Sequence, residues 1–141
     1  MITNQIYAAG AMTGLTWEQQ FEWRDEFAAS IHNATNKWHV FNPCLHSSDI
    51  KEFEMNERES MEYDLFHLLR SDIVIVNFKY NAGSVGTLME MGAAYTHNIP
   101  IIGLNEDDEK LHPWQQEMCL KIFTDYNKMF NYIVNHFINE K

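Results

Sequence analysis

The stretch from residue 73 to residue 104, IVIVNFKYNAGSVGTLMEMGAAYTHNIPIIGL, decides the fold. It opens with Ile73–Val76, a continuous run of β-branched residues that is typical of a strand covered on both faces. A loop over residues 81–86 and a helical stretch over residues 87–97 follow, and the apolar run Pro100–Leu104 predicts a second strand. A strand, a helix and a strand in succession predict two parallel strands joined by a right-handed crossover.

The same alternation continues on both sides of this unit. Further strands are expected at Ile6–Ala9, His39–Phe41 and Leu120–Phe123, and further helices at Trp17–Ile31, at Asn56–Leu69 and from Asp125 onward. The polar segment Leu45–Phe53 fits neither pattern. The sequence therefore predicts a single α/β domain over residues 1–141, a flavodoxin-like open sheet of about five parallel strands with helices on both faces. Open sheets of this kind bind ligands beyond the carboxyl ends of their strands.

Composition and charge narrow the function. The 141 residues include 20 acidic and 10 basic side chains, and the net charge of −10 argues against nucleic-acid binding and against docking on an anionic membrane. This balance still allows a small substrate such as a nucleoside. We expect no signal peptide, because the N-terminus Met1–Gln5 has no basic region followed by an apolar stretch, and no membrane span, because no segment reaches ~20 apolar residues.

The cysteine and histidine spacing gives no support for a bound cofactor. Cys44 and Cys119 lie far apart, and we expect two reduced thiols in a cytoplasmic setting. The seven histidines show no metal-ligand spacing, and residues 8–14 lack the Gly-x-Gly-x-x-Gly fingerprint. We therefore expect neither a metal nor a dinucleotide cofactor.

Asp64 is the first candidate for chemistry. Met61, Leu65 and Leu68 have the spacing of a core-facing stripe on one helix, and Asp64 lies inside that stripe. An inward-facing carboxylate costs several kcal/mol unless it is paired or hydrogen-bonded, as functional carboxylates usually are. A carboxylate at the helix edge, hydrogen-bonded to a neighbouring loop, would give the same pattern, so both interpretations stay open.

Glu90 is the second candidate. It follows a loop in which Gly83 and Gly86 let the backbone approach a ligand closely. We expect Glu90 in the first turn of the next helix, where the helix dipole favours an ionised carboxylate by ~0.3–1 kcal/mol. Two carboxylates in such different environments as Asp64 and Glu90 are typical of an acid paired with a nucleophile or base. A glutamate that only satisfies the helix dipole is the alternative.

Three other positions are open to both structural and functional interpretations. Tyr7, in the first strand, is either a core tyrosine or a hydroxyl beside an active carboxylate. The small residues that surround Gly10 and Met12 suit a flat aromatic ring lying on the backbone. Trp114, after an acidic loop, fits either a lid over a site or an interface contact.

Four segments together resemble the nucleoside 2-deoxyribosyltransferase family: Ile6–Gly14, Phe41–Pro43, Asp64 with Ser71–Asn77, and Gly83–Tyr95. The most specific elements are the Gly-x-x-x-Glu-x-Gly helix start that contains Glu90, and Asp64 ahead of the Ser-Asp pair that opens the third strand. The resemblance covers most of the chain and is weak over residues 45–59 and after residue 105.

The resemblance implies an enzyme that transfers 2-deoxyribose between nucleobases. Glu90 matches the nucleophile that attacks C1′ of a 2′-deoxynucleoside and forms a covalent deoxyribosyl-enzyme. Asp64 matches the acid that protonates the departing base and later deprotonates the incoming free base. Tyr7 matches the hydroxyl that holds the nucleophile. Water in place of the second base would give hydrolysis, and net retention parallels retaining glycosidases.

The resemblance also implies substrate contacts and an assembly. The expected substrate-binding residues are Gly10, Met12, Gly83, Ser84, Gly86 and Trp114. The family is oligomeric, so we expect a homo-oligomer, at least a dimer, in which a neighbouring subunit closes each site. The segment around Trp114 is the candidate contributor to the neighbouring site.

One departure from the family pattern concerns the substrate. Members that act on free nucleosides usually carry Asp six residues before the nucleophile, where this chain has Ser84. Ser at that position is a phosphate ligand in the branch that hydrolyses deoxynucleoside 5′-monophosphates, because a hydroxyl donates to phosphate and a carboxylate repels it. That branch also has Ser and Arg after the first strand, where this chain has Ala11 and Thr13. We therefore favour deoxyribosyl transfer over nucleotide hydrolysis.

Two further classes of function stay as alternatives. A non-catalytic nucleotide-binding module could use the same fold, but it has no need for a carboxylate such as Glu90 aimed at C1′. A small α/β interaction domain is supported only by the aromatic residues between Trp114 and Phe137.

Overall fold

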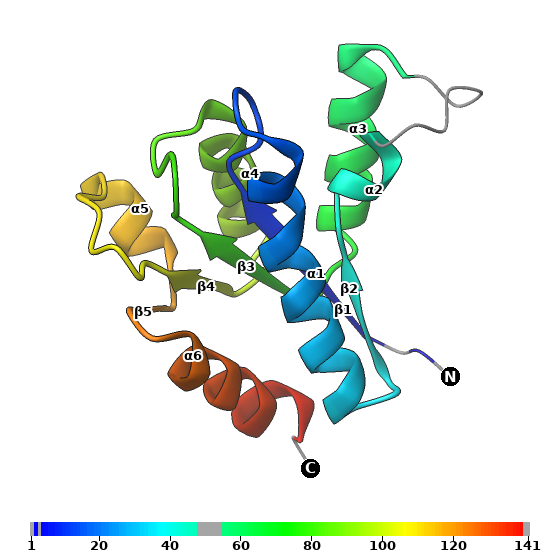
Figure 1. Ribbon diagram of the computed structural model, residues 1–141, viewed down its shortest axis with the longest axis vertical. Coiled ribbons are helices and arrows are strands. Elements are labelled where there is room, and N and C mark those ends of the chain that lie inside the picture. The colour runs from blue at the N-terminus through cyan, green and yellow to red at the C-terminus, as the bar shows by residue number, and fades with distance from the viewer. Residues whose placement is uncertain (1, 3, 48–54, 140–141) are drawn as a thin grey trace.

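A single five-stranded sheet forms the centre of the protein, in a computed structural model that describes residue 2 and residues 4–47 and 55–139 (Figure 1). The strands are β1 (Asn4–Gly10), β2 (Trp38–Phe41), β3 (Ile73–Asn77), β4 (Ile101–Leu104) and β5 (Lys121–Phe123). Their order is β2-β1-β3-β4-β5, and every neighbouring pair is parallel. The predicted α/β open sheet is confirmed.

Helices cover both faces of the sheet. One face carries α1 (Trp17–Ala34) and α6 (Tyr126–Ile133), which continues as the π-helical turn η2 (Val134–Ile138). The other face carries α3 (Glu57–Leu68), α4 (Val85–Thr96) and α5 (Pro113–Met118). The short α2 (Cys44–Ser47) follows β2, and the rest of the predicted polar segment, residues 48–53, lies outside the described residues.

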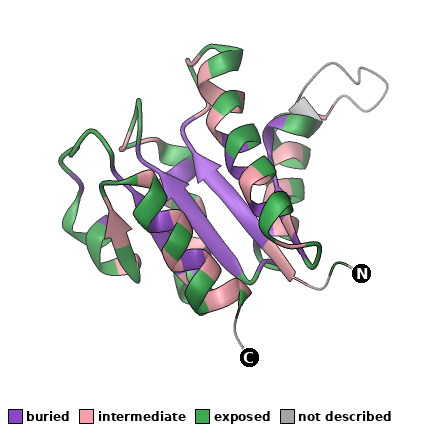
Figure 2. Ribbon diagram, turned by 60° about the horizontal axis from the view of Figure 1, so that its bottom comes forward, coloured by how far each residue is buried: buried purple, intermediate pink, exposed green. Residues whose placement is uncertain are grey.

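Burial follows the alternation of side chains along the strands, which run as a buried layer through the molecule in Figure 2. Ile6 and Ala8 of β1 point into the core under α1 and α6. Tyr7 and Ala9 point into the core under α3 and α4. This alternation places the hydroxyl-bearing Tyr7 on the face where α4 carries Glu90.

Two predicted helices bury their apolar faces only in part; for the first, the sequence places Trp17, Phe21, Phe27, Ala28 and Ile31 toward the core, and for the second, Met61, Leu65 and Leu68. On α1, Phe27 and Ile31 are buried, but Trp17, at the first position of the helix, is 42% exposed. On α3, Leu68 is buried, but Met61 is 41% exposed because the first half of this helix lines a cavity. The expectation that both stripes face the packed core along their whole length was wrong.

The helix boundaries also differ from the prediction at two places. α4 begins at Val85 rather than Thr87, so Glu90 lies in its second turn and not in its first. α5 was not predicted; it forms because Pro113 stands at the first helical position and His112 accepts a hydrogen bond from the Trp114 N–H at 3.1 Å. Among the described residues, no helix is long and apolar enough to cross a bilayer.

Candidate active site

A hydrogen bond between β1 and α4 lies at the centre of the candidate site. The Tyr7 hydroxyl donates to Oε2 of Glu90, 83 residues further along the chain. Tyr7 is buried, with its ring stacked on Phe41 at 5.3 Å between centroids, so its hydroxyl has a fixed direction. The contact therefore orients one Glu90 oxygen and leaves the other for a ligand.

A cavity of about 330 Å³ lies beside this pair, at the carboxyl end of β1. Its walls come from the turn after β1, from the first half of α3 and from the start of α4. The lining residues are Gly10, Met12, Thr13, Glu57, Ser60, Met61, Asp64, Leu65, Ser84, Gly86, Thr87, Met89 and Glu90. Three of them are carboxylates, and none of these described residues is Lys or Arg.

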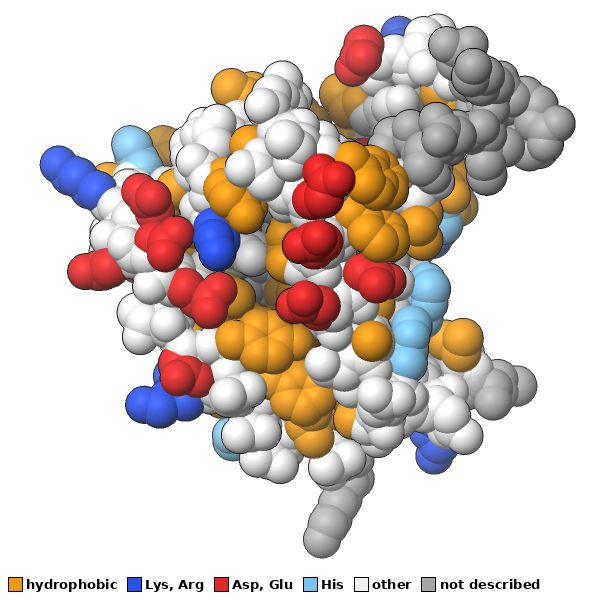
Figure 3. All heavy atoms as spheres, in the orientation of Figure 1, with side chains coloured by type: hydrophobic (Ala, Val, Ile, Leu, Met, Phe, Trp, Pro, Cys, Tyr) orange, Lys and Arg blue, Asp and Glu red, His pale blue; other side chains and the backbone are white. Residues whose placement is uncertain are grey.

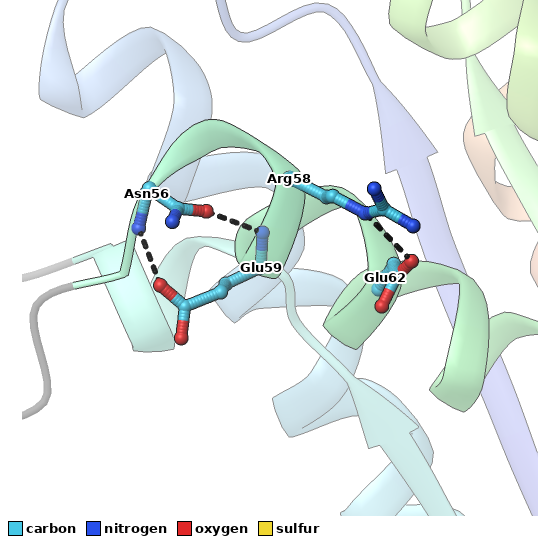
Figure 4. Close-up of polar contacts among 4 residues, drawn as sticks. All are labelled: Asn56, Arg58, Glu59 and Glu62. Carbon is cyan, nitrogen blue, oxygen red and sulfur yellow. Dashed lines mark hydrogen bonds and ion pairs between the residues drawn. The ribbon is translucent and has the colours of Figure 1, made fainter.

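The α3 wall is fixed by a reciprocal cap at its start (Figure 4). The Asn56 side chain accepts from the Glu59 N–H at 2.8 Å, and the Glu59 carboxylate accepts from the Asn56 N–H at 3.1 Å. One turn on, Arg58 pairs with Glu62 at 3.2 Å on the solvent side. Because the cap sets where the helix begins, it also sets the turn on which Asp64 faces the cavity.

The α4 wall begins without a side-chain cap. Ser84 occupies the N-cap position, but its side chain makes no hydrogen bond to the first turn. Thr87 is 3% exposed, and its hydroxyl has no hydrogen-bond partner among the residues that the structure describes. A buried hydroxyl without a partner is costly, so this first turn is built at some expense of stability. Sequence analysis missed Thr87, although its place three residues before Glu90 puts both on one helix face.

Burial dominates the electrostatics of the site. It raises the pKa of Glu90 to about 7, and Asp64 adds to the rise, while the Tyr7 hydrogen bond and the Arg24 charge oppose it. The sequence led us to expect a helix dipole that keeps Glu90 ionised, but burial outweighs any such effect and raises the pKa of this carboxyl. Burial, together with Glu90 and Asp64, also raises the pKa of Tyr7, so this hydroxyl stays a donor.

The structure brings most of the predicted site residues together. Gly10, Met12, Asp64, Ser84, Gly86 and Glu90 line the cavity, and Tyr7 contacts Glu90 from below. Two predicted residues do not line it. Gly83 is exposed in the loop before α4, and Trp114 is 75% exposed on α5, outside the cavity wall.

Sequence analysis also missed Arg24. This arginine is fully buried, and it occupies the position three residues before Phe27 in the apolar stripe of α1. A basic residue within an otherwise apolar stripe was the signal that could have identified it.

A second cavity, of about 260 Å³, lies on the opposite face of the sheet between α1 and α6. Acidic side chains gather over α1 on this face in Figure 3, and Glu18, Glu22, Glu26 and Glu106 line the cavity. It contains none of the predicted site residues. Within the described part of the chain, no three His, Cys, Asp or Glu side chains are placed to hold a metal.

Comparison of the sequence with known protein families identifies one family that it matches. The sequence profile of nucleoside 2-deoxyribosyltransferases matches residues 6–137. No curated protein matches the chain in sequence comparison.

Several solved structures share the fold. A 2-deoxyribosyltransferase from Bacillus psychrosaccharolyticus superposes with a TM-score of 0.75 at 22% identity, over 91% of each chain. A 2-deoxyribosyltransferase from Leishmania mexicana gives 0.65 at 12% identity, over 96% of this chain and 99% of that one. A CMP N-glycosidase from Clostridium botulinum gives 0.56 at 17% identity, over 94% of this chain and 99% of that one.

Proposed function

Because the chain belongs to the nucleoside 2-deoxyribosyltransferase family and is an enzyme of that kind, we propose that it transfers 2-deoxyribose from one nucleobase to another. The substrates are a 2′-deoxynucleoside and a free nucleobase, and water is an alternative acceptor. One observation carries the assignment: the Tyr7 hydroxyl holds Glu90 at the wall of the cavity that Asp64 also lines. A pocket that only binds a nucleoside has no need for a half-buried carboxylate held in this way.

The reaction is a double displacement at C1′ of the sugar. A Glu90 oxygen attacks C1′ while the bond from C1′ to the base nitrogen breaks, and Asp64 gives its proton to the departing base. The product is a deoxyribosyl ester of Glu90. The incoming base attacks C1′, its proton passes to Asp64 and the ester bond breaks, which regenerates the Glu90 carboxylate. Two inversions give net retention.

The charge of the cavity favours an uncharged substrate. Glu57, Asp64 and Glu90 line it, and no lysine or arginine does among the described residues. A phosphate group would lie among these carboxylates in a partly buried cavity, where repulsion between like charges is strong. A free deoxynucleoside carries no such charge, so we propose nucleosides as the substrates.

The experiment is incubation of the protein with deoxyinosine and adenine, followed by chromatography. We expect deoxyadenosine and hypoxanthine from wild type and neither from Glu90→Ala, which removes the attacking oxygen. A slow deoxynucleoside analogue should leave an adduct of one deoxyribosyl unit on the peptide that contains Glu90. Base exchange that survives in Glu90→Ala would contradict the assignment.

Hydrolysis of deoxynucleoside 5′-monophosphates is the second candidate. Ser84 at the start of α4 favours it, because its side chain makes no capping bond and its hydroxyl is available to a phosphate. In that case the monophosphate is hydrolysed and the nucleoside is ignored. Ser84→Asp then shifts preference toward the nucleoside, because a carboxylate repels phosphate. No activity on either substrate would leave a non-catalytic nucleotide-binding module.

We also propose that the protein works as a homo-oligomer in which a second copy helps to close the cavity. Trp114, 75% exposed on α5, is the candidate contact, since aromatic side chains commonly anchor interfaces. Sedimentation at micromolar concentration tests this. A fully active monomer would refute it.

A further inference from the structure

We propose that Arg24 is a positioning residue for Glu90: its buried guanidinium holds the carboxyl end of β1 in shape and presents a positive charge to the Glu90 carboxylate. This inference rests on the proposed role of Glu90 as the nucleophile. Arg24 belongs to α1, on the sheet face opposite α4, so it acts on Glu90 through β1 and not by contact (Figure 1).

Arg24 donates hydrogen bonds to the end of β1 at the edge where β2 no longer pairs with it. β2 pairs with β1 only as far as Tyr7 opposite Phe41, whereas β3 pairs with β1 as far as Gly10. The last carbonyls of β1 on the β2 side therefore have no strand partner. Arg24 satisfies two of them, because Nε donates to the Ala8 oxygen at 3.0 Å and Nη2 donates to the Gly10 oxygen at 2.9 Å.

The guanidinium also shapes the floor of the cavity. Gly10 is the last residue of β1 and lines the cavity together with Met12 from the following turn. A side chain at Gly10 would meet the Trp23 ring at 2.9 Å and Arg24 Nη2 at 3.5 Å. Arg24 and Trp23 thus hold the backbone at the point where β1 leaves the sheet and becomes the cavity floor.

The charge of Arg24 is buried, and it has no ion pair with any residue that the structure describes. Its other two acceptors are the Gln20 carbonyl and, at 3.6 Å, Sγ of Cys44. Burial raises the pKa of the Cys44 thiol, so this acceptor is neutral at ordinary pH. Within the described part of the chain, no carboxylate forms a salt bridge with Arg24. Because the acceptors around the guanidinium are neutral, they do not cancel its positive charge. This charge interacts electrostatically with Glu90 and Tyr7.

Glu90 has few other sources of positive potential. Tyr7 faces it from β1 and Asp64 from α3, with Glu57 on the same cavity wall. α5 also packs on α4 but adds no residue to the cavity lining. Burial and Asp64 raise the pKa of Glu90, whereas Arg24 lowers it. The guanidinium therefore keeps a larger fraction of Glu90 in the ionised form that attacks.

Two substitutions of Arg24 separate charge from shape. Arg24→Gln keeps a donor for the β1 carbonyls and loses the charge. Arg24→Lys keeps the charge and loses the planar set of N–H donors that reaches both carbonyls. The pKa of Glu90 is measured in each by carbon NMR of labelled carboxylates, with Glu90→Gln to assign the resonance. We expect the pKa of Glu90 to rise in Arg24→Gln and to change much less in Arg24→Lys. The acid limb of the pH profile of the transfer rate should shift to higher pH together with the pKa of Glu90.

A third variant leaves Arg24 in place. Cys44→Asp puts a carboxylate beside Nη1, which neutralises the guanidinium, and Cys44→Ser is the uncharged control. Cys44→Asp should raise the pKa of Glu90 and Cys44→Ser should not. Equal titration of Glu90 in wild type, Arg24→Gln and Cys44→Asp would overturn the proposal, and so would failure of both charge-changing variants to fold. The NMR titration needs no turnover, so a shift without base exchange would refute the transferase function and leave the role of Arg24 standing.

Discussion

Glu90→Gln should abolish activity and make the protein more stable than wild type at high pH, by a margin that grows as the pH rises. Burial gives Glu90 a pKa of about 7 in the folded protein against an ordinary value of 4.5. Between these values the folded state binds the extra proton, so the free energy of unfolding of wild type falls as the pH increases. Integrating the two titrations gives a loss of about 2.5 kcal/mol between pH 5 and pH 8. The glutamine amide does not titrate, so the variant escapes this loss.

Thermal unfolding followed by circular dichroism at pH 5, 6, 7 and 8 measures the difference. For a chain of this length, about 2.5 kcal/mol corresponds to roughly 8 °C in Tm. The two proteins should melt at similar temperatures at pH 5, and the variant should melt higher at pH 8. Glu117→Gln, at an exposed position on α5, is the matched control and should track wild type. Parallel curves for Glu90→Gln and wild type would show that burial does not hold the proton on Glu90.

Three further outcomes follow from the site. Asp64→Asn should slow base exchange by ~10²–10⁴-fold because it removes proton transfer, with the smallest loss for bases that leave easily; equal losses for all bases would contradict this. Tyr7→Phe should move the acid limb of the rate profile up by about one pH unit, because the lost hydrogen bond favours ionised Glu90. Thr87→Val should raise the free energy of unfolding by about 1 kcal/mol, since the buried hydroxyl has no partner in the described part of the chain. Thr96→Val, whose hydroxyl bonds the Gly92 and Ala93 carbonyls of the same helix, should give no such gain in a parallel melt.

The sheet was predictable because its strands carry local signals. Ile73–Val76 is apolar without interruption, and β3 is buried along its whole length. The ends of elements were harder. Nothing in the sequence marks Val85 as a helix start, because Ser84 does not cap α4 with its side chain. α5 was missed because six residues are too few to show a helical period.

The site was predictable in its members and less so in its electrostatics. The residues that line the cavity follow strand ends or lie on helix faces that the pattern identifies. The pKa of Glu90 depends on burial and on the charge of Arg24, a residue that is far from Glu90 in sequence and belongs to the other face of the sheet. Hydrogen bonds such as that from Arg24 to the Ala8 carbonyl depend on where β2 stops, and a single sequence does not reveal this.

The strand order has a consequence for how the chain is made. β1 pairs with β2 and β3, and Gln5 contacts Asp72, which lies 67 positions further along the chain. On a ribosome that adds roughly 5–20 residues per second, β1 waits several seconds for its β3 partner. The pair of β1 and β2 alone is only marginally stable in water. Until β3 and α4 emerge, β1 lacks one of its two strand partners, so a translational pause before residue 73 prolongs the exposure of an unpaired strand edge, and a pause after α4 allows β1 and β3 to pair.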